Sequence, residues 1–478
     1  MRTKFVFKMV ALLTVLIQFS QTVSAQNVAT LKFTLPDFRD ISIWKGRAGL
    51  TRFSPDGKYV AVSGNTTDVV IYSVETGEKK SAIDGTGFRA FSFSDDSKFA
   101  IAQNMIDQSL HIYDVETGKL VRDFRGLGKM ASVGRLTGGS GIVNELNGIW
   151  PLFFLEMAHV QVTRNWKNVL VNKNDKEFAI YDVDSGELKF DIEHEKYNSG
   201  LEKTKLAFAF LALAGGSGAG FILLGSTSNA EFNNEGSVLM IANGNKTPTL
   251  WDVTTGKLIA KLDAREKVFH NKFSPDGKVI ATSDVGGITK LWNTINGELI
   301  STIGTKKEKG IVAGWSKDGV KFFIQPLNKG DIRAYDAKGT SLYTFEGSNP
   351  KATLLNTDSS LLLTAPKKDK AILFQIWDAN TGQLLATAPR APKHKSPISI
   401  KLSPDGSLLA ISTGIKDIVE IWNVKGELVQ VLDNSTMPME FSGDGKYLAT
   451  GGVLPKTKTD AGYLWEMSRV ATNERLGE

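Results

Sequence analysis

One pattern of about forty residues recurs along most of this 478-residue chain. Its first copy, residues 53–80, reads FSPDGKYVAVSGNTTDVVIYSVETGEKK. Nine copies align on their first residue, and six of the eight steps between them are 39 to 47 residues long: Phe53, Phe93, Val162, Phe232, Phe273, Trp315, Leu355, Leu402 and Phe441. Each copy places an aromatic residue 19 to 24 positions after its start: Tyr72, Tyr113, Tyr181, Trp251, Trp292, Tyr335, Trp377, Trp422 and Trp465. This register predicts a chain built by repeating one structural unit.

The repeated unit has the pattern of four β-strands joined by tight turns. In Ser-Pro-Asp-Gly, proline fixes the backbone at the second position of a turn, and Asp and Gly suit the positions after it. An alternating strand follows, such as YVAVS or LLAIS, then a strand with the aromatic residue, then an ETG or TTG turn into a fourth strand. Such a unit cannot bury both of its faces alone. The predicted fold is therefore all-β, a single closed β-propeller of about eight to nine four-stranded blades.

Closure of the ring can be tested by counting strands. The ninth copy reaches Trp465 with no fourth strand after it, and a strand-like stretch, DISIW at residues 40–44, precedes the first copy. We expect this N-terminal strand to complete the last blade, because closure removes the exposed edges of the ring. Propellers commonly have about four to eight blades. The sequence alone leaves both counts open, eight blades with an irregular terminal copy or a full ring of nine.

Residues 1–25 have the features of a secretory signal peptide. Arg2, Lys4 and Lys8 precede the apolar run MVALLTVLIQF, and small residues ending at Ala25 form a cleavage pattern. We expect a mature protein that begins at Gln26, with the propeller over residues 26–467 and a C-terminal tail over residues 468–478. Without the signal, 54 basic residues face 51 acidic ones, so the formal net charge is +3 rather than +6. This charge gives no support for a nucleic-acid partner.

The absence of cysteine bears on the compartment. An exported protein without cysteine must depend on its core rather than on disulfides, and it cannot carry a cysteine lipid anchor. Three Asn-x-Thr sequons, at Asn65, Asn245 and Asn434, matter only where a glycosylation system exists. With the signal peptide, these features favour an extracytoplasmic location in a bacterium, periplasmic or secreted.

Two apolar insertions, at about 127–158 and about 197–228, lengthen the second and third spacings between starts. Both fall between a fourth strand and the next first strand, in neighbouring blades, so we expect them on one face of the ring. Residues 206–225 are long and apolar enough for a membrane helix. A crossing would place parts of one closed ring on opposite sides of a bilayer, so we expect no transmembrane span. Aromatic side chains are the candidate contact residues of the insertions: Trp150, Phe153, Phe154, Phe208, Phe210 and Phe221.

No catalytic, cofactor-binding or metal-binding constellation is predicted. The five histidines show no i, i+4 pairing and no acidic neighbour at metal-ligand spacing: His111, His159, His194, His270 and His394. The aspartates of the Ser-Pro-Asp-Gly-like turns are interpreted as turn formers: Asp56, Asp276, Asp405 and Asp444. AGGSGAG at residues 214–220 matches part of a dinucleotide fingerprint, but it interrupts a β-repeat instead of joining a strand to a helix.

These motifs resemble those of the WD-repeat family of β-propellers. The FSPDG turns, the LWD and IWD strand ends and ATSDVGGITKLW at residues 281–292 carry the resemblance, which covers about 40–467 outside the insertions. The family often links a His, a Ser or Thr, a turn Asp and the Trp by hydrogen bonds. Copy eight comes nearest to this network, and with so few histidines the chain resembles a degenerate bacterial-type member: His394, Ser412, Asp417 and Trp422. DVDSGELKF and DVTTGKLIA also resemble segments of quinoprotein-like propellers.

The resemblance implies an exported, non-enzymatic module that binds or scaffolds another protein without a cofactor. The two insertions would supply the contact surface, either to that partner or peripherally to a membrane surface, unless they only pack on each other as a cap. The alternative is a quinoprotein-like or lactonase-like enzyme with its site at the central channel. Such an enzyme would show charged or metal-binding side chains that converge at the channel mouth.

Overall fold

The structure of the protein is a computed structural model, and in the residues that it describes the regular secondary structure consists of β-strands. It describes seventeen stretches of the chain: residues 28–35, 50–63, 69–83, 88–104, 110–124, 160–163, 165–172, 177–193, 230–242, 247–304, 309–327, 330–355, 359–366, 369–391, 399–412, 417–457 and 459–468.

Within these stretches the strands form nine antiparallel sheets of four strands each. The first three sheets consist of β2 (Leu50–Phe53), β3 (Tyr59–Ser63), β4 (Val69–Ser73) and β5 (Lys79–Ile83); β6 (Phe88–Phe93), β7 (Phe99–Asn104), β8 (Leu110–Asp114) and β9 (Leu120–Phe124); and β10 (Val160–Val162), β11 (Asn168–Asn172), β12 (Glu177–Asp182) and β13 (Leu188–Glu193). The next three consist of β14 (Ala230–Phe232), β15 (Val238–Ile241), β16 (Thr249–Asp252) and β17 (Leu258–Lys261); β18 (Val268–Phe273), β19 (Val279–Asp284), β20 (Thr289–Asn293) and β21 (Leu299–Ile303); and β22 (Gly310–Trp315), β23 (Lys321–Pro326), β24 (Ile332–Asp336) and β25 (Ser341–Phe345). The last three consist of β26 (Ser348–Leu355), β27 (Leu361–Pro366), β28 (Ile372–Asp378) and β29 (Leu384–Pro389); β30 (Ser399–Leu402), β31 (Leu408–Ser412), β32 (Ile418–Asn423) and β33 (Leu428–Asp433); and β34 (Ser435–Phe441), β35 (Tyr447–Val453), β36 (Asp460–Met467) and β1 (Ala29–Leu35).

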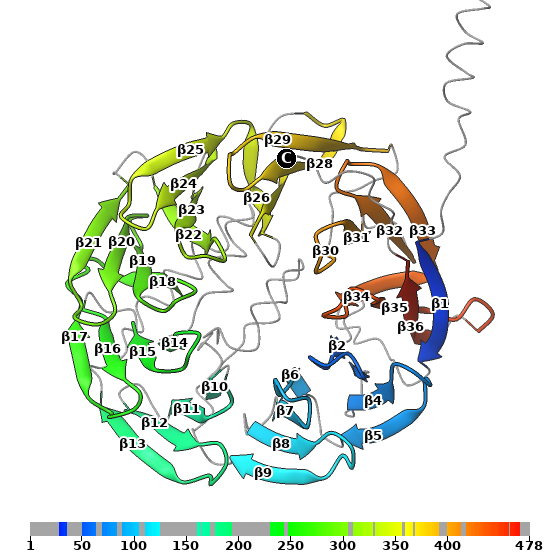
Figure 1. Cartoon of the computed structure of the whole chain (residues 1–478), viewed down its shortest axis with the longest axis horizontal. Helices are drawn as coiled ribbons and strands as arrows, with labels where there is room; N and C mark the ends of the chain where they lie inside the picture. Colours follow the sequence, from blue (N-terminus) through cyan, green and yellow to red (C-terminus); the bar gives the residue numbers. More distant parts are fainter. Residues whose placement is uncertain are drawn as a thin grey trace, which may run out of the picture.

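The nine sheets stand around a common centre, with the first strand of each sheet innermost and the last outermost (Figure 1). Every repeat start is the last residue of an innermost strand, as Phe53 is in β2 and Phe441 is in β34. Every repeat aromatic lies in the third strand, as Trp292 does in β20. The predicted all-β propeller of four-stranded blades is therefore confirmed, and the blade count is nine.

The ring closes through β1, the N-terminal strand of the described chain. It pairs antiparallel with β36, from Ala29 opposite Met467 to Leu35 opposite Gly462. The Gln430 amide extends this pairing, because it accepts a hydrogen bond from Ala29 N–H and donates one to the Ala29 carbonyl, both at 2.8 Å. The prediction that an N-terminal strand completes the last blade is confirmed.

The segment predicted for this closure was wrong. The closing strand is Ala29–Leu35, and residues 40–44 lie outside the described residues. The physical reason is burial against the neighbouring sheets. Leu35 is fully buried in the cluster between the ninth and first sheets, and Ala29 is buried in the cluster between the eighth and ninth.

The core consists of nine hydrophobic clusters, and each cluster joins two neighbouring sheets. The cluster between the fourth and fifth sheets, for example, packs Leu250 and Leu262 against Phe273 and Trp292. The cluster between the ninth and first sheets joins Leu464 to residues of β2, β3 and β4. Because the clusters form an unbroken series, each sheet is stabilised by its two neighbours. Each of the nine interfaces between neighbouring sheets has its own hydrophobic cluster.

The ring has two faces, set by the antiparallel order of the strands. The turn face carries the connection from first to second strand and the connection from third to fourth strand of each sheet. The insertion face carries the connection from second to third strand and the connection from each outermost strand to the next innermost strand. The two predicted insertions are connections of the latter kind.

Deletion of residues 29–35 tests the closure. Loss of this strand should expose the edge of β36 and remove several buried side chains, which costs about 3 kcal/mol or more of unfolding free energy. Deletion of residues 470–478, beyond the paired strands, serves as the control and should leave the stability near that of the full chain. Chemical denaturation of the three proteins measures the difference. Equal unfolding midpoints for the two truncations would contradict closure through β1.

Candidate functional site

The insertion face carries the two long connections that distinguish this chain. Residues 125–159 join β9 to β10, and residues 194–229 join β13 to β14. Both connections leave an outermost strand and return to an innermost strand, and the third sheet lies between them (Figure 1). Their attachment points therefore lie on one face and flank one sheet, as the repeat spacing predicted.

The predicted contact residues all belong to these two connections and lie outside the described residues: Trp150, Phe153, Phe154, Phe208, Phe210 and Phe221. The glycine-rich segment at residues 214–220 lies outside them as well. Within the stretches that the structure describes, no helix is long and apolar enough to cross a membrane. The apolar segment at residues 206–225 lies outside these stretches.

The turn face is built from a hydrogen-bond unit that repeats around the ring. The Ser54 hydroxyl donates to Asp56 Oδ1 at 2.7 Å and accepts from the Tyr59 N–H at 2.9 Å, while Asp56 Oδ1 accepts from the Lys58 N–H at 3.1 Å. The same serine–aspartate pair occurs in five further sheets: Ser94–Asp96, Ser274–Asp276, Ser316–Asp318, Ser403–Asp405 and Ser442–Asp444. These contacts confirm that the predicted aspartates form turns.

Hydrogen bonding to the turn keeps these carboxylates ionised. The hydrogen bond from Ser94 lowers the pKa of Asp96, and the one from Ser316 lowers the pKa of Asp318. Each carboxylate oxygen that faces the turn already accepts from a hydroxyl and from a backbone N–H. The aspartates of these serine–aspartate pairs therefore stabilise the turns by accepting hydrogen bonds.

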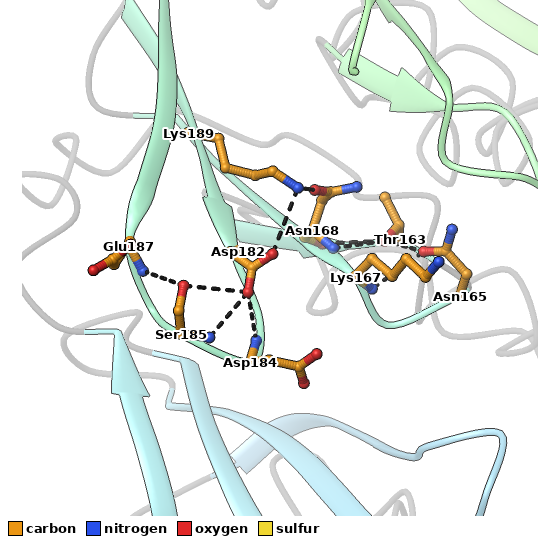
Figure 2. Close-up of polar contacts among 9 residues, drawn as sticks. All are labelled: Thr163, Asn165, Lys167, Asn168, Asp182, Asp184, Ser185, Glu187 and Lys189. Carbon is orange, nitrogen blue, oxygen red and sulfur yellow. Dashed lines mark hydrogen bonds and ion pairs between the residues drawn. The ribbon is translucent and has the colours of Figure 1, made fainter. Parts of the chain in front are cut away.

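The third sheet departs from this pattern at its first turn (Figure 2). Thr163 Oγ1 donates to Asn165 Oδ1 at 2.7 Å, so a neutral Thr–Asn pair replaces the Ser–Asp pair. Trp166 occupies the left-handed position, at φ 58°, where most sheets have glycine. A non-glycine residue there costs on the order of 1 kcal/mol. Trp166 packs against the cluster between the second and third sheets, beside Phe99 and Tyr181, and this packing offsets the cost.

A lysine links the two turns of the third sheet. Lys189 Nζ donates to Asn168 Oδ1 at 2.9 Å and lies 3.5 Å from Asp182 Oδ2 (Figure 2). The backbone N–H of Ser185 is the largest cause of the lowered pKa of Asp182, which also accepts from the Asp184 N–H. The contacts drawn in Figure 2 thus hold the two turns of the third sheet together.

Two apolar side chains on the turn face are far more exposed than their equivalents. Ile295, in the turn between β20 and β21, is 74% exposed, and Val320, in the turn between β22 and β23, is 54% exposed. The residue that corresponds to Ile295 is polar in the other sheets that share this turn, and lysine is the commonest residue at the position of Val320. The sequence analysis missed this pair. The signal that could have revealed it is the replacement of a polar residue at two aligned turn positions.

The remaining exposed large apolar side chains lie almost entirely on the outermost strands. Six of them are leucines at the first residue of such a strand: Leu120, Leu188, Leu258, Leu299, Leu384 and Leu428. Each leucine lies opposite the repeat aromatic residue of the third strand. Next to this pair, the register between the third strand and the outermost strand shifts. Each of these leucines thus pairs with the repeat aromatic residue of its own sheet, and this position in the sheet explains its exposure.

The innermost strands carry charged residues at one shared position, immediately before the repeat start: Arg52, Glu231, Lys272, Lys401 and Glu440. Two of them form an ion pair between the first and ninth sheets, with Arg52 Nη1 2.7 Å from Glu440 Oε2. Glu231 accepts a hydrogen bond from Asn271 of the fifth sheet. These contacts join neighbouring sheets, and no group of three His, Cys, Asp or Glu residues suited to a metal ion occurs among the described residues.

Two of the five histidines lie in described strands. His270 is buried, and its Nε2 lies 2.7 Å from the Val312 carbonyl of the next sheet. His111 is buried beside Tyr113, with its Nε2 3.8 Å from Asp123 Oδ1. Each histidine thus contacts another strand of the ring. His159, His194 and His394 lie outside the described residues.

The tryptophan hydrogen bonds differ from sheet to sheet. In copy eight, Trp422 Nε1 donates to Glu420 Oε2 at 3.0 Å on its own strand. The Glu420 side chain is within reach because it lies on the same face of the strand, two residues away. The middle-strand contact occurs instead in the fifth sheet, where Trp292 Nε1 donates to Thr282 Oγ1 at 2.8 Å. Equivalent Trp–Thr bonds occur in the seventh and ninth sheets.

The fifth sheet is also where the chain matches a known family model. Residues 256–293 match the model described as WD domain, G-beta repeat, from the turn before β17 to the end of β20. The chain contains a WD40 repeat and folds as a β-propeller. The resemblance to the WD-repeat family is supported by this match and by the nine-sheet ring.

Similar curated proteins are WD-repeat proteins of eukaryotes. The chain is 29% identical over 147 residues to the WD repeat-containing protein 26 homolog of Drosophila melanogaster, a match that covers 28% of this chain and 23% of that protein. It is 26% identical over 234 residues to Periodic tryptophan protein 2 of Arabidopsis thaliana, which covers 47% of this chain and 25% of that protein. The chain thus spans a quarter or less of the length of these relatives. They give no support to a bacterial-type or degenerate assignment.

Among solved structures, the crystal structure of the eukaryotic initiation factor superposes with a TM-score of 0.55 at 15% identity. The superposition covers 83% of this chain and 90% of that chain. At this identity the likeness concerns the fold alone.

Substitution of Thr282 tests the tryptophan contact in the WD40 repeat. Thr282→Val keeps the shape of the side chain but leaves the buried Trp292 N–H without its acceptor, which should cost about 1–3 kcal/mol of unfolding free energy. Thr282→Ser keeps the hydroxyl and serves as the control, with a smaller loss. Urea denaturation measures both. A valine variant as stable as the serine variant would show that the hydrogen bond contributes little.

Proposed function

We propose that the protein is an exported, non-enzymatic scaffold whose nine-bladed ring presents a protein-binding surface on its insertion face. The observation that carries the proposal is the placement of the two long connections. They attach on one face and on both sides of the third sheet, so a rigid ring holds their ends close together. Connections of about thirty residues are uncommon within compact domains, and they often serve a function.

The matched relatives support a binding role over a catalytic one. Their names describe proteins with repeated units, and the family match lies in a repeat of this chain. Three charged residues of the innermost strands join neighbouring sheets: Arg52 and Glu440 as an ion pair, and Glu231 through Asn271. The alternative of an enzyme at the central channel has no observation in its favour among the described residues.

The aromatic side chains of the insertions would supply the binding energy. Trp and other large aromatic residues dominate the energetics of protein interfaces because they bury a large area with few rotatable bonds. The contact we propose is with a protein of the cell envelope. Peripheral contact with a membrane surface is the alternative use of the same residues, and the experiment below separates the two.

Replacement of both insertions tests the location of the contact surface. Residues 127–158 and 197–228 are exchanged for short Gly/Ser loops, which the ring should tolerate because the paired strands on either side are kept. The full and trimmed proteins are used to capture partners from the native envelope fraction, with quantitative mass spectrometry. The amount of each partner captured should be at least tenfold lower with the trimmed protein than with the full protein. Sedimentation with phosphatidylethanolamine–phosphatidylglycerol vesicles measures membrane contact separately.

A turn-face variant provides the matched control. Ile295→Asp with Val320→Asp removes the exposed apolar pair on the opposite face without touching either insertion. This variant should retain the partners. The opposite result would contradict the proposal. If the turn-face variant lost the partners and a correctly folded trimmed protein kept them, the contact would lie on the turn face instead of the insertion face.

The export of the protein has its own test. The basic residues and apolar run of residues 1–25 should direct secretion and then be removed, since they have the pattern of a signal peptide. N-terminal sequencing of protein from the periplasmic and secreted fractions should find Gln26 first. As a control, Leu13→Arg with Leu16→Arg interrupts the apolar run and should retain the precursor in the cytoplasm. An intact Met1 on exported protein would contradict the assignment.

A further inference from the structure

The two faces of the ring differ in charge. By sequence, the connections of the turn face carry 11 basic and 16 acidic residues, whereas those of the insertion face carry 27 basic and 17 acidic residues. A chain with a small formal net charge thus has an acidic face and a basic face. Charges of one sign gathered on one face act together on a partner, and the net charge of the whole chain does not reveal them.

Four short connections carry most of the basic excess of the insertion face. We call them the basic arc, and they follow β21, β27, β29 and β35: residues 304–309, 367–371, 390–398 and 454–459. Together they contain 26 residues, of which 11 are basic and 2 are acidic. They follow strands of the fifth, seventh and ninth sheets, whereas the two insertions follow strands of the second and third (Figure 1). The basic arc and the insertions are therefore separate features of one face.

Each connection of the basic arc has one basic residue among the described residues. Lys370 and Lys456 are exposed, and Lys309 and Arg390 are half-buried. The seven other basic residues of the arc stand in the same connections by sequence and lie outside the described residues. The four described residues thus mark where the charge of the arc joins the ring.

Backbone contacts fix these positions. The Arg390 N–H donates to the Ala371 carbonyl at 2.7 Å, and Arg390 Nε donates to the Ile372 carbonyl at 3.3 Å. The two basic connections of the seventh sheet therefore meet at this point. The Leu327 N–H donates to the Lys309 carbonyl at 3.0 Å, which ties the arc to the neighbouring connection of the sixth sheet.

The residue type of the arc indicates the kind of partner. Ten of its eleven basic residues are lysines. Arginine is enriched in protein–protein interfaces, where lysine is depleted, and arginine is also the side chain that grips a single carboxylate or phosphate through two hydrogen bonds. Lysine is a flexible, strongly hydrated point charge. A lysine-rich set spread over three sheets suits an extended anionic surface better than a compact protein partner.

We propose that the basic arc binds the surface of a membrane that contains anionic lipids, with the insertion face toward the bilayer. Connections on one face of a ring can meet one plane at the same time, and each lysine near an anionic bilayer adds to the attraction. The contact is with lipid headgroups. This inference does not rest on the proposed protein contact, which uses the aromatic side chains of the insertions.

Removal of three lysines tests the arc. The mature protein, residues 26–478, is sedimented with vesicles of phosphatidylglycerol and phosphatidylethanolamine at low ionic strength. Lys309→Gln with Lys370→Gln and Lys456→Gln should weaken vesicle binding at least about tenfold, because three charges near the headgroups are lost. The unfolding midpoint of this variant should stay near that of wild type.

A turn-face variant is the matched control. Lys58→Gln with Lys278→Gln and Lys446→Gln removes the same charge from three exposed lysines of the opposite face. This variant should bind the vesicles as wild type does. Equal binding by the arc variant and wild type, or equal weakening in both variants, would overturn the proposal.

Three further measurements identify the partner of the arc. Wild-type binding should fall at least about tenfold between about 0.05 M and about 0.5 M salt, because salt screens exposed charges. Phosphatidylcholine vesicles should bind far more weakly than the anionic ones. A correctly folded protein without the two insertions should still bind the anionic vesicles, which separates this inference from the protein contact.

Three results would contradict a lipid surface. Equal binding to phosphatidylcholine vesicles would exclude an electrostatic contact. Loss of vesicle binding in the trimmed protein, with retention in the arc variant, would assign the membrane contact to the insertions. Tighter binding to soluble poly-glutamate than to the anionic vesicles would assign the arc to an acidic polypeptide.

Discussion

The pairing of β1 with β36 is the contact on which the ring depends. Each sheet of a repeat array contacts only its neighbours, so an unclosed array would leave the ninth sheet without its outermost strand and the β36 edge unpaired. The pairing joins segments more than four hundred residues apart, such as Leu35 and Gly462. The Arg52–Glu440 pair reinforces the adjoining seam between the ninth and first sheets.

Closure has a consequence for function, because it fixes the positions of all connections relative to one another. The two long connections flank the third sheet, whose own turns are held by the Lys189 contacts and by Trp166. The seam just after the second connection contains Glu231, and burial raises the pKa of this carboxyl group to about 7. The frame that carries the proposed contact surface is thus held firmly at the third sheet.

The repeat was predictable because its signals are local. The Ser-Pro-Asp-Gly turns depend on hydrogen bonds between residues two to five positions apart, so their side chains alone specify them. The sequence did not predict which of several possible segments or side chains forms a given contact. Residues 40–44 have a strand pattern, but pairing with β36 belongs to Ala29–Leu35, which places Leu35 in a core made by distant strands. The pattern likewise did not predict that Trp422 bonds to Glu420 of its own strand.

The sequence by itself determined the four-stranded unit, its repetition and the connections that carry the insertions, since each of these depends on short-range turn chemistry and on the alternation of apolar residues. Only the tertiary structure decided which segment closes the ring, that nine sheets take part, and which charged residues meet across the seams. Arg52 and Glu440 are 388 residues apart, and Asn271 and Glu231 are 40 apart. The raised pKa of Glu231 belongs to this second group, because burial by neighbouring sheets, and no feature of its own strand, removes the carboxyl group from water.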